Sequence, residues 1–531
     1  MWTTGLLFFI GTLITLRVFK SLRLRSQFPP GPRGLPIVGN LLQLPTNRPW
    51  LIFDKWTKQY GPIFYFNVAG QNIVVLGTHK AVADLLDRRS NIYSYRPNYV
   101  VLNTLTGGMY WAFTQADNLW KKTTSTAVVR ALSAQTAKEY FPYQETESII
   151  MVDQLLTDPE IFADHFQRAS TSLTLSIVYG WPPILSSTHP TVLQIDQFNR
   201  RLLQAAALGS SWVEFEYFKW MKYLPKWMCR WRRDAEENFD RDSALLEGLS
   251  MDVQKQMDAG VETTAIANKL LRDTDSQFEA AWNSASVYAA GAETTSGQLA
   301  WFLQAMILYP ETQRLAQEEL DSVVGPDRLP TFHDYESLPY IRATVKEVLR
   351  WRSLTPLGLP HRLSQDDYYE GYILPKDTIC FANIWSLHHD SKLFGHDAEH
   401  FNPRRFFNAD GELDFSIADT RNEGHFGYGF GKRICPGRHI ANNSLFIHIA
   451  FLLWAFNITP EVDADGNTHL PDPLQCIEAS IIYELLDLPF CLCFKYCSRP
   501  TPFRCNIVAR RADVTDIVAQ AKVERIHQES I

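Results

Sequence analysis

Hydrophobic positions recur with helical spacing through long parts of the chain, most clearly in its second half. Phe278 to Leu308 predicts a long helix that is interrupted at Gly291, because glycine disfavours a helix interior. Ile440 to Phe456 is apolar apart from a few polar positions and predicts a buried helix. Lys346 to Arg352 predicts the end of a helix before Pro356. Helices are therefore the main elements expected.

The segments with strand-like character are short. Ile63 to Leu76 contains β-like runs that are separated at Gly70. Gly371 to Ile384 has the β-branched and aromatic residues of strands on either side of a turn at Pro375 to Asp377. We therefore expect small sheets beside the helices.

Length and composition set outer limits on what the protein can be. The chain has 531 residues, of which 46% are hydrophobic, so it can bury a large core. Length alone would suggest about three or four domains. A net charge of -7 argues against a nucleic-acid-binding protein, because such a protein needs a basic surface. The 8 cysteines have no regular spacing, which favours free thiols in a reducing compartment over a disulfide scaffold.

The N-terminus predicts attachment to a membrane. Met1 to Phe19 makes a marginal transmembrane helix, because its strictly apolar part is shorter than the roughly 20 residues that a span needs. Basic residues are concentrated after this segment, so the side that follows it should face the cytosol. A cleaved signal peptide is the alternative, but it would carry its positive charge before the apolar run. Pro29 to Pro32 then predicts a stiff connection.

One cysteine lies in a glycine-rich loop just before the apolar segment that begins at Ile440. In this loop, Tyr428 to Arg438, the residue is Cys435. A thiolate can bind a metal end-on, and it is the haem ligand that favours O–O cleavage. The glycines allow amide N–H groups to approach the sulfur, and Arg433 is placed to meet an anionic group such as a haem propionate. The alternative is a tight turn around a buried structural cysteine.

Three further motifs occur along the chain. Residues 290–295 read Ala-Gly-Ala-Glu-Thr-Thr, and residues 403–406 read Pro-Arg-Arg-Phe. Residues 347–350 read Glu-Val-Leu-Arg, in which the charged side chains are one helical turn apart and can pair. Together with the Cys435 loop, these motifs resemble those of the cytochromes P450, in the order that the family requires. The resemblance covers residues 29–510 and is strongest to fungal microsomal P450 monooxygenases of secondary metabolism, of the O-methylsterigmatocystin oxidoreductase type.

The resemblance implies a mainly α fold with small β-sheets, the cytochrome P450 fold, with a single large catalytic domain and an N-terminal membrane anchor. It places the protein in the endoplasmic reticulum membrane, crossed once, with the catalytic domain in the cytosol. Aromatic and basic residues between Trp212 and Trp231 suit a second contact with the membrane, and an amphipathic helix pair packed on the core is the alternative. The expected divisions are a transmembrane anchor at 1–20, a basic and proline-rich hinge at 21–36, the catalytic domain at 37–512 and a C-terminal tail at 513–531.

The resemblance also implies a cofactor, haem b (iron protoporphyrin IX), and the residues that hold it. Cys435 would be the axial ligand of the haem iron. Further cofactor-binding residues would be Arg433, Arg96, Trp120 and His361. A structural network would join Glu347, Arg350 and Arg405 beneath the haem.

On the opposite side of the haem, Glu293 and Thr294 would be the catalytic pair, because a hydroxyl backed by a carboxylate can organise the delivery of protons to dioxygen. Gly291 would widen the groove of this helix for dioxygen. The implied substrate pocket is mostly apolar, which favours a lipophilic substrate. Its segments would be 100–113, 285–290 and 357–359.

The activity implied is that of a haem-thiolate monooxygenase, which inserts one oxygen atom from O2 into a lipophilic small molecule. A terpenoid, polyketide or aromatic compound of fungal secondary metabolism would suit. Electrons would come from NADPH through NADPH–cytochrome P450 reductase, with cytochrome b5 as a further candidate partner. A basic face for this docking would combine Lys121, Lys122, Lys432 and Arg438, for which ordinary solvated charge is the alternative.

Some segments depart from the family pattern. The family motif Trp-x-x-x-Arg has Thr124 at its arginine position, which makes 121–126 atypical, and Tyr428 stands where the family prefers phenylalanine. The segment 481–497 is apolar, cysteine-rich and longer than expected. It is either a natural insertion or the product of an imperfect gene model. These departures leave open a catalytically impaired haem-binding protein, and a P450 isomerase or dehydratase that needs no reductase is a further alternative.

A zinc peptidase is a competing reading of another motif. His396 to His400 matches H-x-x-E-H, in which two histidines on one helical face bind zinc. That chemistry needs a helix of several turns. Gly395 before the motif and Pro403 after it leave room for little more than one turn, so we reject this reading.

Overall fold

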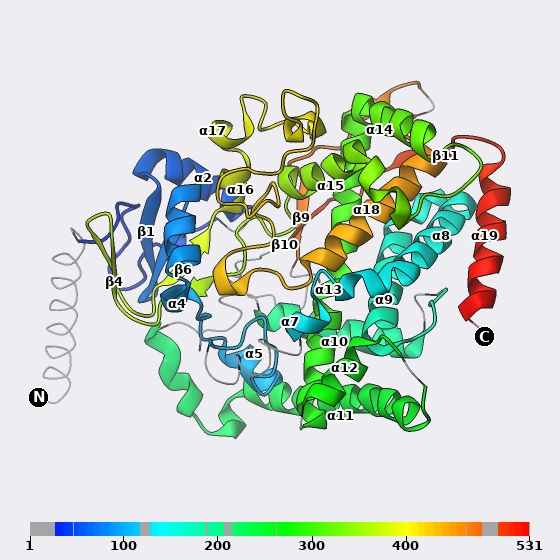
Figure 1. Cartoon of the computed structure of the whole chain (residues 1–531). Helices are drawn as coiled ribbons and strands as arrows, with labels where there is room; N and C mark the ends of the chain where they lie inside the picture. The colour runs from blue at the N-terminus through cyan, green and yellow to red at the C-terminus, as the bar shows by residue number, and fades with distance from the viewer. Residues whose placement is uncertain are drawn as a thin grey trace, which may run out of the picture.

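The computed structural model describes residues 27–45, 47–116, 120, 128–186, 189–206, 213, 216–261, 263–274, 276–463, 465–479 and 497–529. Helices predominate over this part of the chain and the sheets are small, as the sequence predicts (Figure 1). The predicted anchor at 1–20, the atypical segment 121–126 and nearly all of the segment 481–497 lie outside the described residues. Within the described residues, no helix combines the length and the apolar character needed to cross a membrane.

The α-helices differ widely in length, and several of the short ones lie in the first quarter of the chain. They are α2 Pro49–Tyr60, α3 His79–Val82, α4 Ser90–Tyr93, α5 Val100–Leu105, α7 Val129–Ala131, α8 Phe141–Thr157, α9 Phe162–Tyr179, α10 Pro190–Ala206, α11 Arg230–Asp258, α12 Ile266–Asp273, α13 Gln277–Leu308, α14 Pro310–Val323, α15 Pro339–Trp351, α16 Ile384–His388, α17 Ser391–Phe394, α18 Arg438–Ala455 and α19 Val514–Glu529.

The strands are short and form separate small sheets. They are β1 Ile63–Val68, β2 Gln71–Leu76, β3 His361–Arg362, β4 Asp367–Tyr369, β5 Tyr372–Leu374, β6 Ile379–Ala382, β7 Phe456–Val462, β8 Thr468–His469, β9 Cys476–Ala479, β10 Cys497–Pro500 and β11 Cys505–Ala509. The largest sheet has the order β1-β2-β6-β3, with β2 and β6 parallel and the other neighbours antiparallel. The turn predicted at Pro375 to Asp377 is present between β5 and β6, which belong to different sheets, and Asp377 has a positive φ of 65°.

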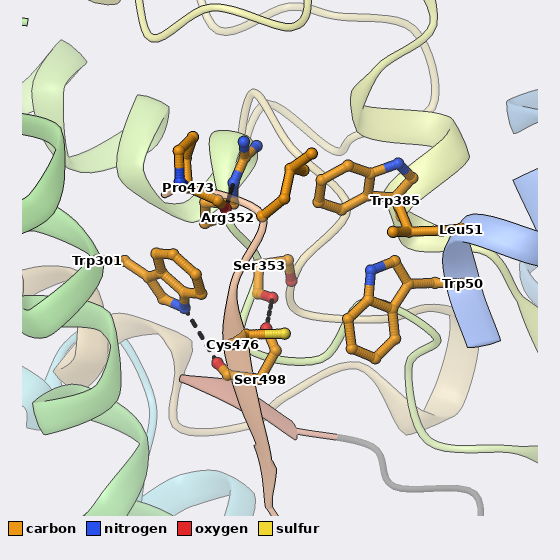
Figure 2. A pocket seen from close by; sticks show the side chains of 10 residues that line it. Trp50, Leu51, Trp301, Arg352, Ser353, Trp385, Pro473, Cys476 and Ser498 are labelled. Atoms are coloured by element: carbon orange, nitrogen blue, oxygen red, sulfur yellow. Dashed lines mark hydrogen bonds between the residues drawn. The ribbon is translucent and has the colours of Figure 1, made fainter. Parts of the chain in front are cut away.

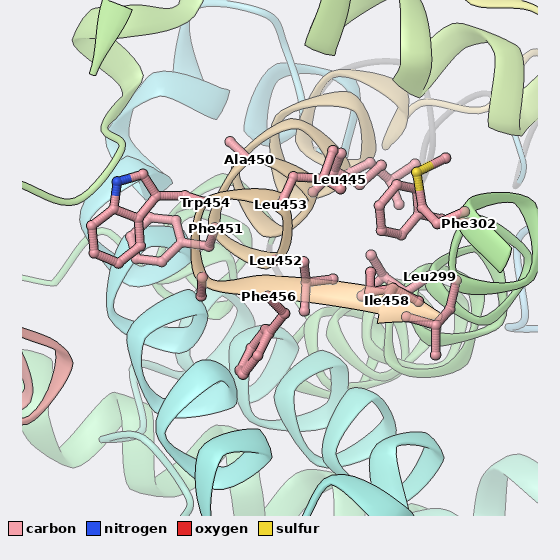
Figure 3. Packing of buried hydrophobic residues seen from close by; sticks show 14 of the residues in the cluster. Leu299, Phe302, Leu445, Ala450, Phe451, Leu452, Leu453, Trp454, Phe456 and Ile458 are labelled. Carbon is pink, nitrogen blue, oxygen red and sulfur yellow. The ribbon is translucent and has the colours of Figure 1, made fainter. Parts of the chain in front are cut away.

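Helix α13 runs through the middle of the fold and packs against α9, α11, α12 and α18 (Figure 1). Its sequence is apolar on most sides, which suits a helix surrounded by other helices. Ser276 caps its N-terminus by accepting a hydrogen bond from the Glu279 amide, and Pro310 follows its C-terminus. Figure 3 shows Leu299 and Phe302 of α13 packed with apolar side chains of α18 and β7. This packing fixes the helix on which the expected catalytic pair lies.

The interruption expected at Gly291 is wrong, because α13 is a continuous helix through this residue. A Cβ atom at Gly291 would lie 3.1 Å from the Thr174 side chain on α9. The glycine therefore permits a close approach of two helices, and their contact offsets its low helix propensity. The side of Gly291 on which other residues carry a side chain faces α9. This packing therefore gives no support to the expected role of Gly291 in widening a groove for dioxygen.

The C-terminal part of the chain is partly helical. Helix α19 packs on α8, with Val514 and Val518 fully buried in the same apolar cluster as α18. Lys522 pairs with Asp153 of α8 at 2.6 Å. The predicted tail at 513–531 is thus held against the fold over residues 514–529.

The H-x-x-E-H motif lies in turns after α17, not in a helix. The carbonyl oxygen of His400 accepts a hydrogen bond from Arg350 at 2.9 Å. This arrangement agrees with the rejection of a zinc-peptidase site.

Candidate functional site

The loop that carries Cys435 depends on glycine at two positions. Gly429 and Gly431 have φ angles of 77° and 57°, in the left-handed region that favours glycine. Gly431 also lies against the carbonyl of Leu86, where a Cβ atom would come within 2.2 Å of the oxygen. The Cys435 amide donates to the carbonyl oxygen of Tyr428 at 2.8 Å and closes the loop. These constraints hold the thiol at the entrance to α18.

Two opposing effects act on the Cys435 thiol. Burial raises its pKa, whereas the backbone amides of Gly437 and Arg438 and the Arg438 guanidinium lower it. The amides are therefore placed to stabilise a thiolate once a metal replaces the proton. Among the described residues, no group of three or more His, Cys, Asp and Glu side chains could hold a metal ion. A single thiolate suits an iron whose other ligands come with its macrocycle, as in haem.

Arg433 is oriented by backbone carbonyls of two segments. Its guanidinium donates to the carbonyl oxygens of Ser94 at 2.8 Å, Trp111 at 3.1 Å and Thr114 at 2.5 Å. It also lies over the Trp120 ring, 4.3 Å from the centroid. These carbonyl oxygens orient the guanidinium and carry no formal negative charge of their own. The structure thus brings Arg433 and Trp120 into direct contact.

Arg96 and His361 lie close to each other. Arg96 donates to the carbonyl oxygens of Ala112 at 2.9 Å and Pro360 at 2.7 Å. The His361 Nδ1 lies 2.8 Å from the Tyr93 carbonyl oxygen. Burial, together with Arg96 and Arg433, lowers the pKa of His361 to about 3. The imidazole is therefore neutral at physiological pH, and its single N–H, on Nδ1, donates to the Tyr93 carbonyl oxygen. Its Nε2 is then an acceptor, so donation to a propionate would require the ring to gain a second proton.

The centre of α13 has one face that is open to solvent. Ala290 and Thr294 are exposed, although most residues on either side of them in this helix are buried. They are one helical turn apart and share a face, and the Thr294 hydroxyl donates to the Ala290 carbonyl at 2.9 Å. Ile440, in the first turn of α18, packs against the apolar cluster that includes Ala292. Helix α18, into which the Cys435 loop leads, packs on α13, so the loop and α13 are linked through this helix contact.

Glu293 does not point the same way as Thr294, because successive residues of a helix are about 100° apart. Its carboxylate is partly buried and lies 3.5 Å from Arg499 of β10. Burial raises the pKa of Glu293, and the positive charge of Arg499 opposes that shift. The acid and the alcohol are thus neighbours in sequence with different surroundings.

The structure brings Glu347, Arg350 and Arg405 together. Arg350 donates to both carboxylate oxygens of Glu347 at 2.7 Å, and Arg405 Nε donates at 3.0 and 3.1 Å. Arg350 also binds the carbonyl oxygens of His388 and Ala398, which anchors the chain after α17. Glu347 and Arg350 are both fully buried. This geometry is that of a structural ion-pair network.

The three expected pocket segments meet in one apolar cluster. Leu105 and Phe113 from the first segment, Ala285 from the second and Leu357 from the third are buried together, and Trp282 packs among them. These contacts make an apolar region beside the open face of α13. The donor set fits haem: one thiol, oriented cations, a neutral histidine and apolar walls.

The comparisons agree with this geometry. The model of the family described as Cytochrome P450 matches residues 29–478. A cytochrome P450 monooxygenase of Armillaria gallica is 45% identical over 525 residues, which cover 97% of this chain and 96% of the relative. Cytochrome P450 monooxygenase 58 of Postia placenta is 41% identical, with 96% and 93% covered. The chain belongs to the cytochrome P450 family, and like these relatives it is a monooxygenase.

Two residues at the site acquire contacts that the sequence did not predict. Arg499 was not among the site residues expected from the sequence, and the structure places it beside Glu293. The Tyr428 hydroxyl, absent from phenylalanine, donates to Asn442 at 2.8 Å. The sequence around Arg499, which reads Cys-Ser-Arg-Pro over β10, gives no signal that this residue meets Glu293. The family match ends at residue 478, just before the segment that the sequence marks as atypical.

Proposed function

We propose that the protein inserts one atom of O2 into a C–H bond or a double bond of a lipophilic small molecule and reduces the other atom to water. Two electrons from NADPH and two protons balance this reaction. The observation that carries the proposal is the Cys435 loop at the start of α18, a helix that packs on α13, whose centre is exposed at Ala290 and Thr294. Haem bound between these elements supplies the iron centre that activates dioxygen.

The residues on the Cys435 side hold the cofactor. The Cys435 thiolate would bind the haem iron, and the amides of Gly437 and Arg438 would stabilise its negative charge. Arg433 and Arg96 would pair with the propionates, and His361, beside Arg96, would contribute to the same part of the site. Trp120 packs against Arg433 and limits its movement. Each of these groups is already oriented by backbone contacts, so little reorganisation accompanies binding.

The residues on the α13 side handle protons. Burial raises the pKa of the Glu293 carboxyl and so favours its protonated form, which suits a group that supplies a proton. Thr294 offers the lone pairs of its hydroxyl oxygen toward the open face, where they can orient water. The apolar cluster around Phe113, Ala285 and Leu357 excludes bulk water and binds an apolar substrate.

The substrate class that suits this apolar cluster is a terpenoid, a polyketide or an aromatic compound of fungal secondary metabolism. NADPH–cytochrome P450 reductase is the proposed electron donor, with cytochrome b5 as a second donor. The proposed location is the endoplasmic reticulum membrane. Exposed apolar side chains after α10 support a membrane contact, and they are Trp220, Tyr223, Trp227 and Met228.

The test is a reduced carbon-monoxide difference spectrum of the full chain, followed by NADPH-dependent turnover with added reductase. We expect the red-shifted Soret band of thiolate-ligated haem, and its loss in Cys435→Ser. Cys505→Ser is the matched control, because Cys505 is also a half-buried free thiol but lies on β11. A thiolate band that persists in Cys435→Ser would contradict the ligand assignment. Haem binding without product from any lipophilic substrate would favour an impaired protein.

A further inference from the structure

Arg499 is held in place by the residue before it. Ser498 accepts a hydrogen bond from the Trp301 indole on α13 at 3.0 Å, and its amide donates to the Leu354 carbonyl at 2.7 Å. Its hydroxyl donates to the Ser353 carbonyl at 3.3 Å. Figure 2 shows Ser498 between Trp301 and Ser353, at the edge of a small pocket. Strand β10 is therefore fixed to α13 and to the chain after α15, and Arg499 cannot shift without breaking these bonds.

The guanidinium of Arg499 reaches α13 at Glu293. Its Nη2 donates to the Glu293 carbonyl oxygen at 2.7 Å and lies 3.5 Å from the carboxylate Oε2. One turn further along α13, a Cβ atom at Gly297 would lie 3.2 Å from the Arg499 Nε and 2.7 Å from a methyl carbon of Leu354. A side chain at 297 would crowd the guanidinium, so the glycine leaves room for this contact.

The charged surroundings of Glu293 come from three elements. Arg499 of β10 and Arg200 of α10 favour its ionised form. Asp196 of α10 disfavours it, and burial disfavours it most. The Tyr288 hydroxyl on α13 is also near enough to feel the charge of Glu293. Among these groups, Arg499 is the largest influence that favours the carboxylate, and the described contacts place it in direct reach.

We propose that Arg499 is a positioning residue for Glu293: it fixes the orientation of the carboxyl group and partly neutralises its charge. The proposal rests on the proposed role of Glu293 as the acid that supplies protons. The carbonyl contact ties the guanidinium to the helix backbone, and the carboxylate contact then places the acid. The separation of 3.5 Å is long for a charge-assisted hydrogen bond, so the pair can open when the carboxyl group gains a proton and form again when it loses it.

The experiment measures the protonation of Glu293 directly in the haem-loaded protein. Infrared difference spectra over a pH series would follow the carboxylic-acid C=O stretch of Glu293, assigned by its loss in Glu293→Gln. Arg499→Gln should move the midpoint upward by about one pH unit, the lower end of what an opposite charge at this distance produces. Arg499→Lys should move it by less than about half of that, because the charge stays but the forked geometry is lost.

Arg504→Gln is the matched control. Arg504 lies further along the same C-terminal stretch and pairs with Glu461 at 3.4 Å, but it is 83% exposed. It should leave the Glu293 midpoint unchanged. The ratio of product formed to NADPH consumed should fall several-fold in Arg499→Gln, with part of the loss restored in Arg499→Lys.

The outcomes separate the two proposals. An unchanged midpoint in Arg499→Gln, with the thiolate Soret band intact, would overturn the role of Arg499 even if Glu293→Gln abolishes turnover. If Glu293→Gln leaves coupled turnover unchanged, the proposed role of Glu293 fails, and with it the functional importance of Arg499. If Arg499→Gln does not fold, Arg499→Lys decides: a midpoint identical to that of the unchanged protein, together with a full loss of coupling, would point to a purely structural tie between β10 and α13.

Discussion

Glu347 and Glu293 both lie beside arginine side chains, but they differ in burial and in the number of hydrogen bonds that they accept. Glu347 is fully buried and accepts hydrogen bonds from Arg350, Arg405 and the Asn402 amide. Within the described part of the chain, the Glu293 carboxylate has one arginine at 3.5 Å, and its side chain is 16% exposed. The first carboxylate has its hydrogen-bonding capacity filled, and the second does not.

This difference separates a structural carboxylate from one that can exchange a proton. A carboxylate that accepts hydrogen bonds from several charged donors is stabilised in its ionised form, so it is poorly suited to exchange a proton. A partly buried carboxylate with one long contact is less strongly held in its ionised form, and burial raises the pKa of Glu293. The filled site therefore suits a structural role, and the unfilled site suits the proton exchange that we propose.

The largest effect is expected from breaking the filled site. Arg350→Met would leave the Glu347 charge buried with part of its partners removed, and would lower the free energy of unfolding by about 3–5 kcal/mol. Thermal unfolding and the yield of protein with a thiolate Soret band measure this. Arg314→Met is the control, because its pairs with Glu311 and Glu318 are solvent-exposed and should contribute less than about 1 kcal/mol. Equal losses in both variants would contradict the structural role of the Glu347 network.

The second prediction concerns Glu293, where a substitution should reduce turnover without reducing the yield of folded protein. Glu293→Gln keeps the size of the side chain and removes its proton exchange, so the folded yield should be nearly unchanged while product formation falls roughly 100-fold or more. Steady-state turnover per unit of thiolate-ligated haem is the measurement. Glu347→Gln should show the reverse pattern, with low yield and nearly normal turnover in the molecules that fold. A similar pattern in the two variants would remove the distinction between the sites.

The dependence of stability on pH should also have opposite signs at different buried groups. Burial lowers the pKa of His448 to about 3, as it does for His361. The unfolded state therefore binds more protons below about pH 6.5, and each histidine lowers the stability by up to about 1.4 kcal/mol per pH unit as the pH falls toward 3. Glu293 has a raised pKa, so the folded state holds its proton longer and a rise in pH through that pKa lowers the stability.

Denaturant unfolding of the ligand-free chain between about pH 4 and 7 would measure this slope. His448→Gln should make the acid side less steep, because glutamine does not titrate. An unchanged slope in His448→Gln would show that His448 is already protonated in the folded state.

The sequence predicted the parts of the site that depend on local pattern. The Cys435 loop, the Glu347 to Arg350 pair and the strands around Asp377 are each encoded within a short stretch, by glycine placement, helical spacing or β-branched residues. The continuity of α13 through Gly291 was not predictable, because it depends on Thr174 of α9, more than 100 residues away in sequence.

Arg499 escaped prediction for the same physical reason. Its partner Glu293 is 206 residues away in sequence, and the contact depends on how Trp301 and Ser353 hold Ser498. No local spacing reports such a contact. The segment 481–497 is atypical in composition, whereas the residue that contacts Glu293 is Arg499, two positions after that segment.

The smallest effect is expected from a third carboxylate network, on the Cys435 side. Tyr428 joins the loop to this network: its carbonyl accepts from the Cys435 amide, and its hydroxyl donates to Asn442 at 2.8 Å. Asn442 in turn donates to Glu423, which pairs with Lys346 at 2.5 Å. Tyr428→Phe restores the residue that the family prefers and removes only the hydroxyl, so Asn442 keeps its contacts with Glu423 and Lys346.

Because one hydrogen bond within a network that stays otherwise filled is lost, Tyr428→Phe should lower the free energy of unfolding by about 1 kcal/mol. The carbonyl that accepts from the Cys435 amide is retained, so the thiolate Soret band should stay in place. Chemical denaturation and the carbon-monoxide spectrum test the two statements separately. A loss of unfolding free energy above about 3 kcal/mol, or a shift to the band of histidine-ligated haem, would contradict this expectation. Either result would mean that each donor of this network is needed, as at Glu347.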